Sequence, residues 1–356
     1  MGGVPVVDAS CLFVNGGASG ADATAAVDSA IGAALASAGA CVLTGIPEEV
    51  TVGPAKAERL FSVFDLPLDA LDEVSGRGLW GYSAGLSWAK SWNAGPPLPS
   101  PRPGTWDLDA HVFTPTALAD ADAHFQPNVW PEERALPGWR AAMEAHHAAL
   151  DRLGTTCVRS LARWLEVDEE EAARPWRENL STLRPLKYTA PPADHDDSSE
   201  PLLVFPEHRD NGTGLSILWS SAPGLEMQSP AGEWLAVPVV ANSVSLHVGK
   251  GLELLSGGRL RATPHRVVAT AHNRLSLGFF FCPHPGNEVK PLAGRSEEAA
   301  VELEESMVAA SARWAVATGG ASEAMVSEPG RSESESWPWW SSNSVRGYRA
   351  QLKAAL

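Results

Sequence analysis

Two histidines, an aspartate and an arginine within residues 201–283 have the types and spacing that metal chemistry needs. His208 and Asp210 are two positions apart, so in an extended strand they point to the same side. His265 follows about 55 residues after Asp210. Two imidazoles and one carboxylate that leave open positions on one face form the ligand set of a non-haem Fe(II) centre. A zinc hydrolase uses the same donors, so these three residues alone do not decide the metal.

Arg274 and Ser276 form a candidate carboxylate anchor after the third candidate ligand. They also lie two positions apart, so one strand would project both side chains to the same face. A guanidinium beside a hydroxyl binds a carboxylate through paired, charge-assisted hydrogen bonds. A metal next to such an anchor predicts a co-substrate that chelates the metal at one end and carries a carboxylate at the other.

Short apolar runs must position these side chains. They are residues 215–219, 225–227, 234–237 and 244–248. Turn residues such as Asn-Gly, Pro-Gly and Gly-Gly separate the runs. Many short strands at regular spacing favour a β-barrel or double-sheet jelly roll. We therefore expect a mainly β fold with flanking α-helices, built on a double-stranded β-helix (jelly roll, cupin-like) barrel.

The same segment resembles the iron(II)- and 2-oxoglutarate-dependent oxygenases of the isopenicillin N synthase-like superfamily, in its plant-type branch. The family pattern is His-x-Asp, about 55 residues, His, and then Arg-x-Ser, and His208, Asp210, His265, Arg274 and Ser276 match it. The match extends to residues 224–226, 232–234, Gly249, 257–258, 263–268 and 279–283.

The resemblance implies which residues hold which group. His208, Asp210 and His265 would be the Fe(II) ligands, and dioxygen would take an open position on the metal. The distal carboxylate of 2-oxoglutarate would pair with Arg274, assisted by Ser276 and by one tyrosine. That tyrosine is Tyr188, which matches the family's Asn-x-Tyr element although Leu186 replaces the Asn. Phe280 is the candidate substrate contact near the metal face.

Three functions are consistent with these residues. The first is a dioxygenase that hydroxylates, desaturates or cyclises a small, partly apolar metabolite, as in specialised metabolism. It would convert 2-oxoglutarate and O2 to succinate and CO2, with ascorbate stimulating turnover. The second is a 2-oxoglutarate-independent Fe(II) oxidase of the isopenicillin N synthase or aminocyclopropane carboxylate oxidase type, and the third is a jelly-roll binding module without catalysis. A third protein ligand, Asp210, argues against halogenation, because related halogenases give that position to halide.

Other histidines compete for the role of ligand. His195 opens a second His-x-Asp pattern, but it lies in a polar loop, where metals are positioned less well than on strands. His247 is in an apolar strand, where the family has Asn, and is predicted to be a core histidine. His272 is expected in a hairpin turn. The adjacent His146 and His147 lie on a helix, so they point in different directions and are expected to be surface or packing residues.

The amino-acid composition limits which cellular compartment and which binding partners are expected for the protein. A net charge of −16 argues against nucleic acid or an anionic membrane as partner. No apolar run of about 18 residues occurs, and no basic n-region precedes an apolar core, so neither a transmembrane helix nor a signal peptide is expected. Four scattered cysteines without a Cys-x-x-Cys pair are typical of reduced thiols. We expect a cytoplasmic protein that acts on a small molecule.

The length of 356 residues is ordinary for one barrel with helical additions. We expect a single oxygenase domain over 1–356. Residues 1–180 would form a helix-rich portion with a long irregular loop at 83–127. Residues 181–285 would form the jelly-roll catalytic core, and 286–356 a C-terminal helical cap.

Apolar residues at helical spacing predict helices at 22–38, 54–64 and 137–165. The Trp-rich loop 83–127 either covers the substrate or packs on the barrel. The indoles of residues 337–340 either close the barrel mouth, form an interface or anchor the tail. The sequence leaves open these alternatives and whether the protein is a monomer or a dimer.

Overall fold

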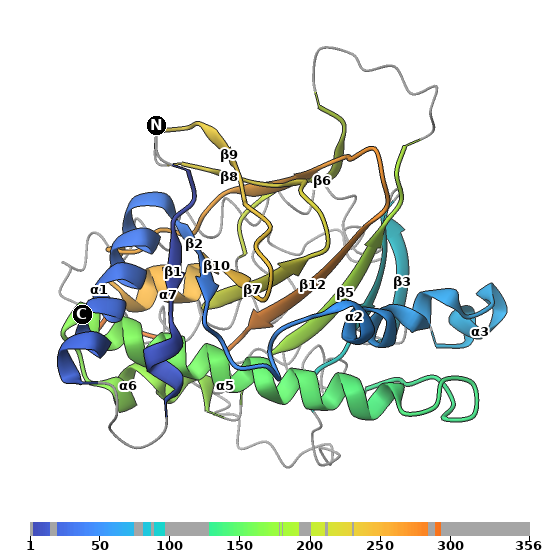
Figure 1. Cartoon of the computed structure of the whole chain (residues 1–356), viewed down its shortest axis with the longest axis horizontal. Coiled ribbons are helices and arrows are strands. Elements are labelled where there is room, and N and C mark those ends of the chain that lie inside the picture. Colours follow the sequence, from blue (N-terminus) through green and yellow to red (C-terminus); the bar gives the residue numbers. More distant parts are fainter. Residues whose placement is uncertain are drawn as a thin grey trace, which may run out of the picture.

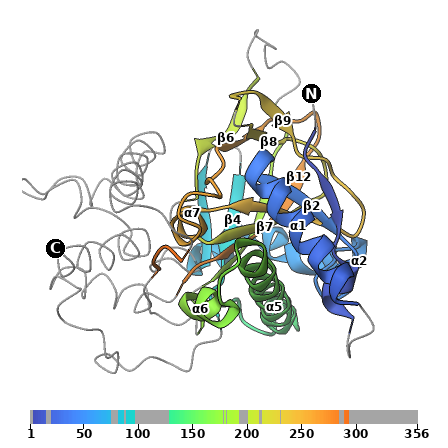
Figure 2. The same cartoon turned by 90° about the vertical axis from the view of Figure 1, so that its left-hand side faces the viewer.

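The computed structural model describes residues 3–14, 20–74, 81–86, 89–96, 128–177, 179, 181–191, 201–210, 213–229, 231–283 and 289–292. Within these residues, two β-sheets face each other and helices cover the outer side of the larger sheet (Figure 1). Figure 2 shows the same layers from the side, with β6, β8 and β9 at the top, α5 and α6 at the bottom, and α1 along the right-hand side. This arrangement confirms the predicted jelly roll with flanking helices.

The larger sheet has eight strands in the order β1-β2-β10-β7-β12-β5-β4-β3. Its strands are β1 (Val6–Asp8), β2 (Ala40–Thr44), β3 (Gly81–Leu86), β4 (Ala89–Asn93), β5 (Thr182–Tyr188), β7 (Leu215–Ser220), β10 (Val244–Val248) and β12 (Arg274–Phe281). β1 and β2 pair parallel, and the other neighbours pair antiparallel.

The smaller sheet has four strands in the order β6-β11-β8-β9. They are β6 (Leu203–His208), β8 (Leu225–Gln228), β9 (Trp234–Ala236) and β11 (His265–Val268). All pairs in this sheet are antiparallel. The first and third candidate ligands therefore lie on neighbouring strands of this sheet.

The helices include one long element under the larger sheet. The α-helices are α1 (Ala21–Ala38), α2 (Pro54–Phe61), α3 (Leu68–Glu73), α5 (Trp139–Leu165), α6 (Glu169–Ala173) and α7 (Lys250–Leu255). Short 3-10 turns occur at η1 (Ser10–Phe13), η2 (Ser62–Asp65) and η3 (Arg174–Trp176). The predicted helices at 22–38, 54–64 and 137–165 correspond to α1, α2 with η2, and α5. No described helix is both long and apolar enough to span a bilayer.

Strand alternation divides the apolar residues between two cores. On β12, Leu277, Phe279 and Phe281 belong to the large cluster shared with the helices. On β5, Leu186 and Tyr188 belong to a second cluster enclosed between the two sheets. In β12, Arg274 pairs with Tyr188 and so faces this second space. The interior between the sheets is therefore the chamber that carries the candidate site.

The prediction of an irregular loop over 83–127 is wrong for residues 83–86 and 89–93. Residues 81–86 and 89–93 form the antiparallel hairpin of β3 and β4 at the edge of the larger sheet. Trp92 on β4 is fully buried, with its ring 5.0 Å from that of Trp139. It packs on the helix side and so takes no part in a lid.

Other predictions fall outside the described residues. These are Trp88, Trp106 and the rest of the loop from 97 to 127, the His195-Asp196 pair, the helical cap over 293–356 and the indoles of 337–340.

Candidate metal and co-substrate site

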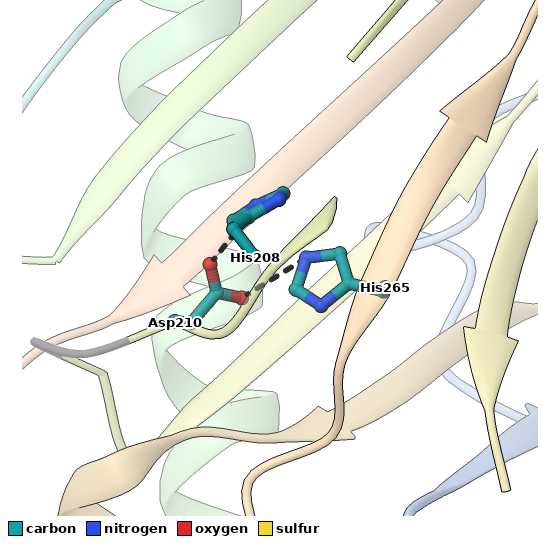
Figure 3. Close-up of side chains that lie close together, drawn as sticks. All are labelled: His208, Asp210 and His265. Atoms are coloured by element: carbon teal, nitrogen blue, oxygen red, sulfur yellow. Dashed lines mark ion pairs between the residues drawn. The ribbon is translucent and has the colours of Figure 1, made fainter. Parts of the chain in front are cut away.

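The two candidate imidazoles are brought together by strand pairing. His208 ends β6, His265 begins β11, and the two residues are direct partners across the antiparallel ladder. Their ring centroids are 4.1 Å apart. Asp210 follows β6 by two residues, and its carboxylate lies beside the two rings with one oxygen directed at each (Figure 3). One ligand atom from each residue lies within 4.8 Å of the others. No other such trio of His, Cys, Asp or Glu occurs in the described part of the chain.

Both imidazoles present the same nitrogen to the centre. Nε2 of His208 is 3.7 Å from Oδ1 of Asp210, and Nε2 of His265 is 3.7 Å from Oδ2. The other nitrogen, Nδ1, bonds the carbonyl of Pro206 in His208 and that of Thr263 in His265, at 2.9 and 3.0 Å. A carbonyl only accepts, so each Nδ1 carries the proton and each Nε2 keeps a free lone pair. This is the tautomer that a metal ligand requires.

Burial and neighbouring groups keep His208 and Asp210 in their metal-binding forms. Burial, followed by the neighbouring His265, lowers the pKa of His208 to about 4, so its ring is neutral near pH 7. Burial raises the pKa of Asp210, but the two imidazoles and the Ser216 hydroxyl outweigh it and the net shift is downward. The Ser216 hydroxyl donates to Oδ2 of Asp210 and orients the carboxylate. His208 and Asp210 are thus free of competing protons near neutral pH.

A buried guanidinium with an unused donor lies in the same chamber. Arg274 is 2% exposed. Its Nε donates to the Ala222 carbonyl at 3.1 Å and its Nη2 to the Ser220 hydroxyl at 2.5 Å. Its Nη1 has no hydrogen-bond partner among the described residues. The guanidinium lies 5.2 Å from the ring centroid of Tyr188. A buried charged donor without a partner is costly, so this group fits a carboxylate ligand.

Ser276, predicted to assist Arg274 in binding the co-substrate carboxylate, has its hydroxyl bonded to the backbone in this structure. Ser276 is buried two residues from Arg274, but its hydroxyl donates to the Trp219 carbonyl at 3.1 Å. The hydroxyl that holds the guanidinium belongs to Ser220, which the sequence reasoning missed. Ser220 pairs with Ser276 across β7 and β12, and both face the chamber.

Phe280 lies at the end of β12 that is far from Arg274, and Arg184 of the neighbouring strand β5, which the sequence analysis did not predict, lies beside it. Phe280 lies on the same strand face as Arg274 and is half-buried. Arg184 of β5 stacks on its ring, with its Cζ 5.0 Å from the ring centroid. Arg184, Leu186 and Tyr188 lie at alternate positions of β5 and so share one face, and this period-two spacing from Tyr188 could have pointed to Arg184.

The rival histidines are placed differently. His247 is fully buried, as predicted for a core residue, and its ring centroid is 5.7 Å from that of His265. Its Nε2 bonds the Ser245 hydroxyl at 3.0 Å, but its Nδ1 has no partner. His272 is exposed in the turn before β12. His146 and His147 are both buried packing residues of α5.

Comparison with known proteins adds independent evidence. The family model described as the 2OG-Fe(II) oxygenase superfamily matches residues 184–283. A 2-oxoglutarate-dependent dioxygenase of Gibberella zeae is 28% identical over 250 residues, covering 62% of this chain and 61% of the relative. The clavatol oxidase claD of Penicillium crustosum is 30% identical over 187 residues, covering 50% and 54%. The chain thus spans less than two thirds of the length of both relatives.

Solved structures show the same fold. A full-length Neurospora crassa protein in complex with alpha-KG and thymine has a TM-score of 0.68 at 20% identity and covers 86% of this chain and 96% of that one. The dioxygenase for auxin oxidation 1 of Arabidopsis thaliana, in complex with 2-oxoglutarate, has a TM-score of 0.58 at 19% identity, with coverages of 81% and 96%.

Proposed function

The chain carries a domain of the 2OG-Fe(II) oxygenase superfamily over residues 184–283, and on this premise we propose that it is an Fe(II)- and 2-oxoglutarate-dependent dioxygenase that oxidises a small molecule. One observation carries the proposal. The trio His208, Asp210 and His265 shares a chamber with a buried arginine, Arg274, that has an unpaired donor. A metal that binds one end of a dicarboxylate and a guanidinium that binds the other end require this combination.

The chain's own residues would divide the work as follows. His208 and His265 would hold Fe(II) through Nε2, and Asp210 through its carboxylate. With 2-oxoglutarate bound, the metal would supply the oxidative chemistry that turns this co-substrate and O2 into succinate and CO2 while the substrate is oxidised. Ser216 keeps the Asp210 carboxylate oriented, and the carbonyls of Pro206 and Thr263 keep the imidazoles in the required tautomer.

At the other end of the chamber, Arg274 would bind the distal carboxylate through its unpaired Nη1. Its Nη2 is held by Ser220 and its Nε by the carbonyl of Ala222, so the guanidinium is fixed before the ligand arrives. Tyr188 packs against the guanidinium, and Ser276 anchors β12 to β7 through Trp219. These roles disfavour the binding module, which needs neither a metal trio nor a buried donor.

The relatives favour 2-oxoglutarate dependence over the 2-oxoglutarate-independent alternative. Several of them are named as 2-oxoglutarate-dependent dioxygenases, in Gibberella zeae and Talaromyces stipitatus among others. Names such as clavatol oxidase and proline hydroxylase, and the thymine bound to the Neurospora crassa protein, indicate small-molecule substrates for those proteins. We extend this to a small metabolite here, oxidised by hydroxylation, desaturation or ring formation. The four free cysteines favour a reducing compartment, which we propose is the cytoplasm.

Two measurements on the purified protein test the proposal. Fe(II) added without oxygen to the protein with 2-oxoglutarate is expected to produce a weak visible charge-transfer band. With O2 and ascorbate, which keeps the iron reduced, the protein is expected to release succinate. Asp210→Ala should remove both signals, whereas His272→Ala, on an exposed turn, should keep both. Wild-type protein that gives neither signal would exclude the assignment, and the band without succinate in the presence of a substrate would favour an inactive binding protein.

A further inference from the structure

Arg184 is a second arginine that faces the chamber. It is the direct partner of Gly278 across β5 and β12, on the same strand face as Leu186 and Tyr188. Arg274 lies four residues from Gly278 along β12, which corresponds to about 13 Å of extended strand. The two guanidinium groups therefore originate from different levels of the same chamber wall.

The surroundings of Arg184 fix its position and leave its charge uncompensated. Its Nε donates to Oδ1 of Asn93 on β4 at 2.5 Å, and its Cζ lies 5.0 Å from the ring centroid of Phe280. Among the described residues, no carboxylate lies within 4.0 Å of its guanidinium nitrogens. Arg163 and Arg266, by contrast, each form a close ion pair. A cation held in a partly desolvated place without a counter-ion is costly and calls for an anion.

Asp210 is the acid whose negative charge acts on Arg184. Burial lowers the pKa of Arg184, and the Asp210 carboxylate partly opposes that shift. This carboxylate is already committed by the proposed function to the metal. Fe(II) and Arg274 together carry three positive charges, and Asp210 and the 2-oxoglutarate dianion carry three negative charges. These charges cancel, so the positive charge of Arg184 is not balanced by any of these groups. A further anionic ligand could balance it.

The side chains around Arg184 remain accessible to a ligand. Arg184, Asn93 and Phe280 are all partly exposed, although they lie on the inner face of the sheet. The residue opposite Arg184 is glycine, and the Phe280 ring packs over it so closely that a Cβ at Gly278 would approach the ring to 3.1 Å. Because the Oδ1 of Asn93 is used by Arg184, its amide NH2 group is available as a further donor. The apolar cluster that includes Leu186 and Met227 lines the same interior.

We propose that Arg184 binds a carboxylate of the primary substrate, so that the enzyme acts on small monocarboxylates with an apolar body. The carboxylate would pair with the guanidinium beside the Asn93 amide, and the apolar body would lie against Phe280. This inference rests on the proposed function, because the charge count assumes that Fe(II) and 2-oxoglutarate occupy the chamber. Arg184 is then the residue that determines the substrate class.

The test compares acids with their neutral amides. Wild-type protein is loaded with Fe(II) and saturating 2-oxoglutarate without oxygen and titrated by calorimetry. The probes are phenylacetate, cinnamate and hexanoate, each against its primary amide. At least one acid is expected to bind about 10- to 100-fold more tightly than its amide, the range for a charge-assisted hydrogen bond in a partly buried place. Arg184→Gln should abolish this preference, and Arg184→Lys should keep part of it.

Controls separate this inference from the proposed function. Lys187→Gln removes a cation three positions further along β5, where the side chain pairs with Asp65 at 3.0 Å on the other face, and should keep the acid preference. Thermal unfolding and 2-oxoglutarate binding check that each variant is folded. If wild-type protein binds Fe(II) and 2-oxoglutarate but no acid is preferred, or if Arg184→Gln keeps the preference, Arg184 does not select carboxylates. If the wild type fails to bind Fe(II) and 2-oxoglutarate, it is the proposed function that fails.

Discussion

His208 and His265 are direct partners across the antiparallel pair of β6 and β11, with ring centroids 4.1 Å apart. The ladder itself sets the separation of the two imidazoles, because side chains of paired residues project to the same face. The register of the two strands shifts between His265 and Val267 and again between Val267 and Val268. The pairing of His265 with His208 lies before these shifts. A slip by one residue would turn one imidazole to the opposite face and separate the two rings. The geometry of the site therefore depends on backbone pairing, and single side-chain changes can remove a ligand without changing the ladder.

Metal binding should stabilise the fold in a way that requires the trio. Adding Mn(II) without oxygen, as a redox-stable substitute for Fe(II), is expected to raise the melting temperature of the wild type by several degrees, because only the folded chain assembles the ligands. His265→Ala should abolish the rise, and thermal unfolding followed by circular dichroism measures it. The exposed His272→Ala is the matched control and should behave like the wild type. An equal rise in His265→Ala would show that the metal binds elsewhere.

Replacing Arg274 should weaken 2-oxoglutarate binding far more than replacing Ser276. Arg274 offers a buried, unpaired Nη1, whereas the Ser276 hydroxyl is occupied by the Trp219 carbonyl. We expect Arg274→Lys to raise the Kd for 2-oxoglutarate about 10- to 100-fold, since lysine cannot reproduce the fork held by Ser220 and Ala222. Ser276→Ala should raise it less than about fivefold. Calorimetry of the Mn(II)-loaded protein measures both constants, and the reverse order would disprove the assigned roles.

Where a sequence prediction rested on a local period, the structure can be compared with it directly. Arg274 and Ser276 are two apart on β12 and lie on one face, as strand alternation predicts, whereas Asp210 lies beyond the end of β6, where alternation no longer applies. The α5 helix was predicted from apolar spacing, and Trp139–Leu165 is close to the expected 137–165. Where a residue's neighbours come from the same short segment, sequence periodicity was enough.

The residues that were missed depend on partners far away in the chain. Ser220 holds Arg274 across 54 positions, and Arg184 bonds Asn93 across 91. No local pattern distinguishes a serine that touches a guanidinium from one that faces solvent. The β3–β4 hairpin was missed for the same reason, because β4 is stabilised by pairing with β5 and by burial of Trp92 against Trp139.

Replacing Gly32 of α1 by alanine should destabilise the protein, although helix propensity favours alanine. Alanine in place of a mid-helix glycine normally stabilises by about 1 kcal/mol. At Gly32, however, a Cβ would lie 2.2 Å from the Trp164 ring of α5. We expect Gly32→Ala to lower the free energy of unfolding by about 1–3 kcal/mol, the usual cost of overpacking. Urea unfolding measures it, with Ser29→Ala on the exposed side of α1 as the control. A gain in stability would mean that the two helices separate easily.

His146 should make the protein less stable in mild acid. Its side chain is 3% exposed, its Nδ1 bonds the Glu49 carbonyl at 3.2 Å, and its Nε2 has no hydrogen-bond partner in the described part of the chain. Burial, with a smaller contribution from Lys56, lowers its pKa from 6.5 to about 4. As the pH falls from 6.5 towards 4, His146 binds a proton in the unfolded chain but stays neutral in the folded chain. The free energy of unfolding therefore decreases over this pH range.

For the metal-free protein we expect this histidine to account for a loss of about 2 kcal/mol in unfolding free energy between roughly pH 7 and 4.5. His146→Leu, which cannot take up a proton, should be less sensitive to pH by that amount. Urea unfolding at both pH values gives the difference between the two proteins, which cancels the contributions of all other acids and bases. His272→Leu, at an exposed position, is measured alongside as the matched histidine-to-leucine control. Parallel pH curves for wild type and His146→Leu would show that the folded protein accommodates the charged ring, by opening the contact between α5 and the loop that carries Glu49.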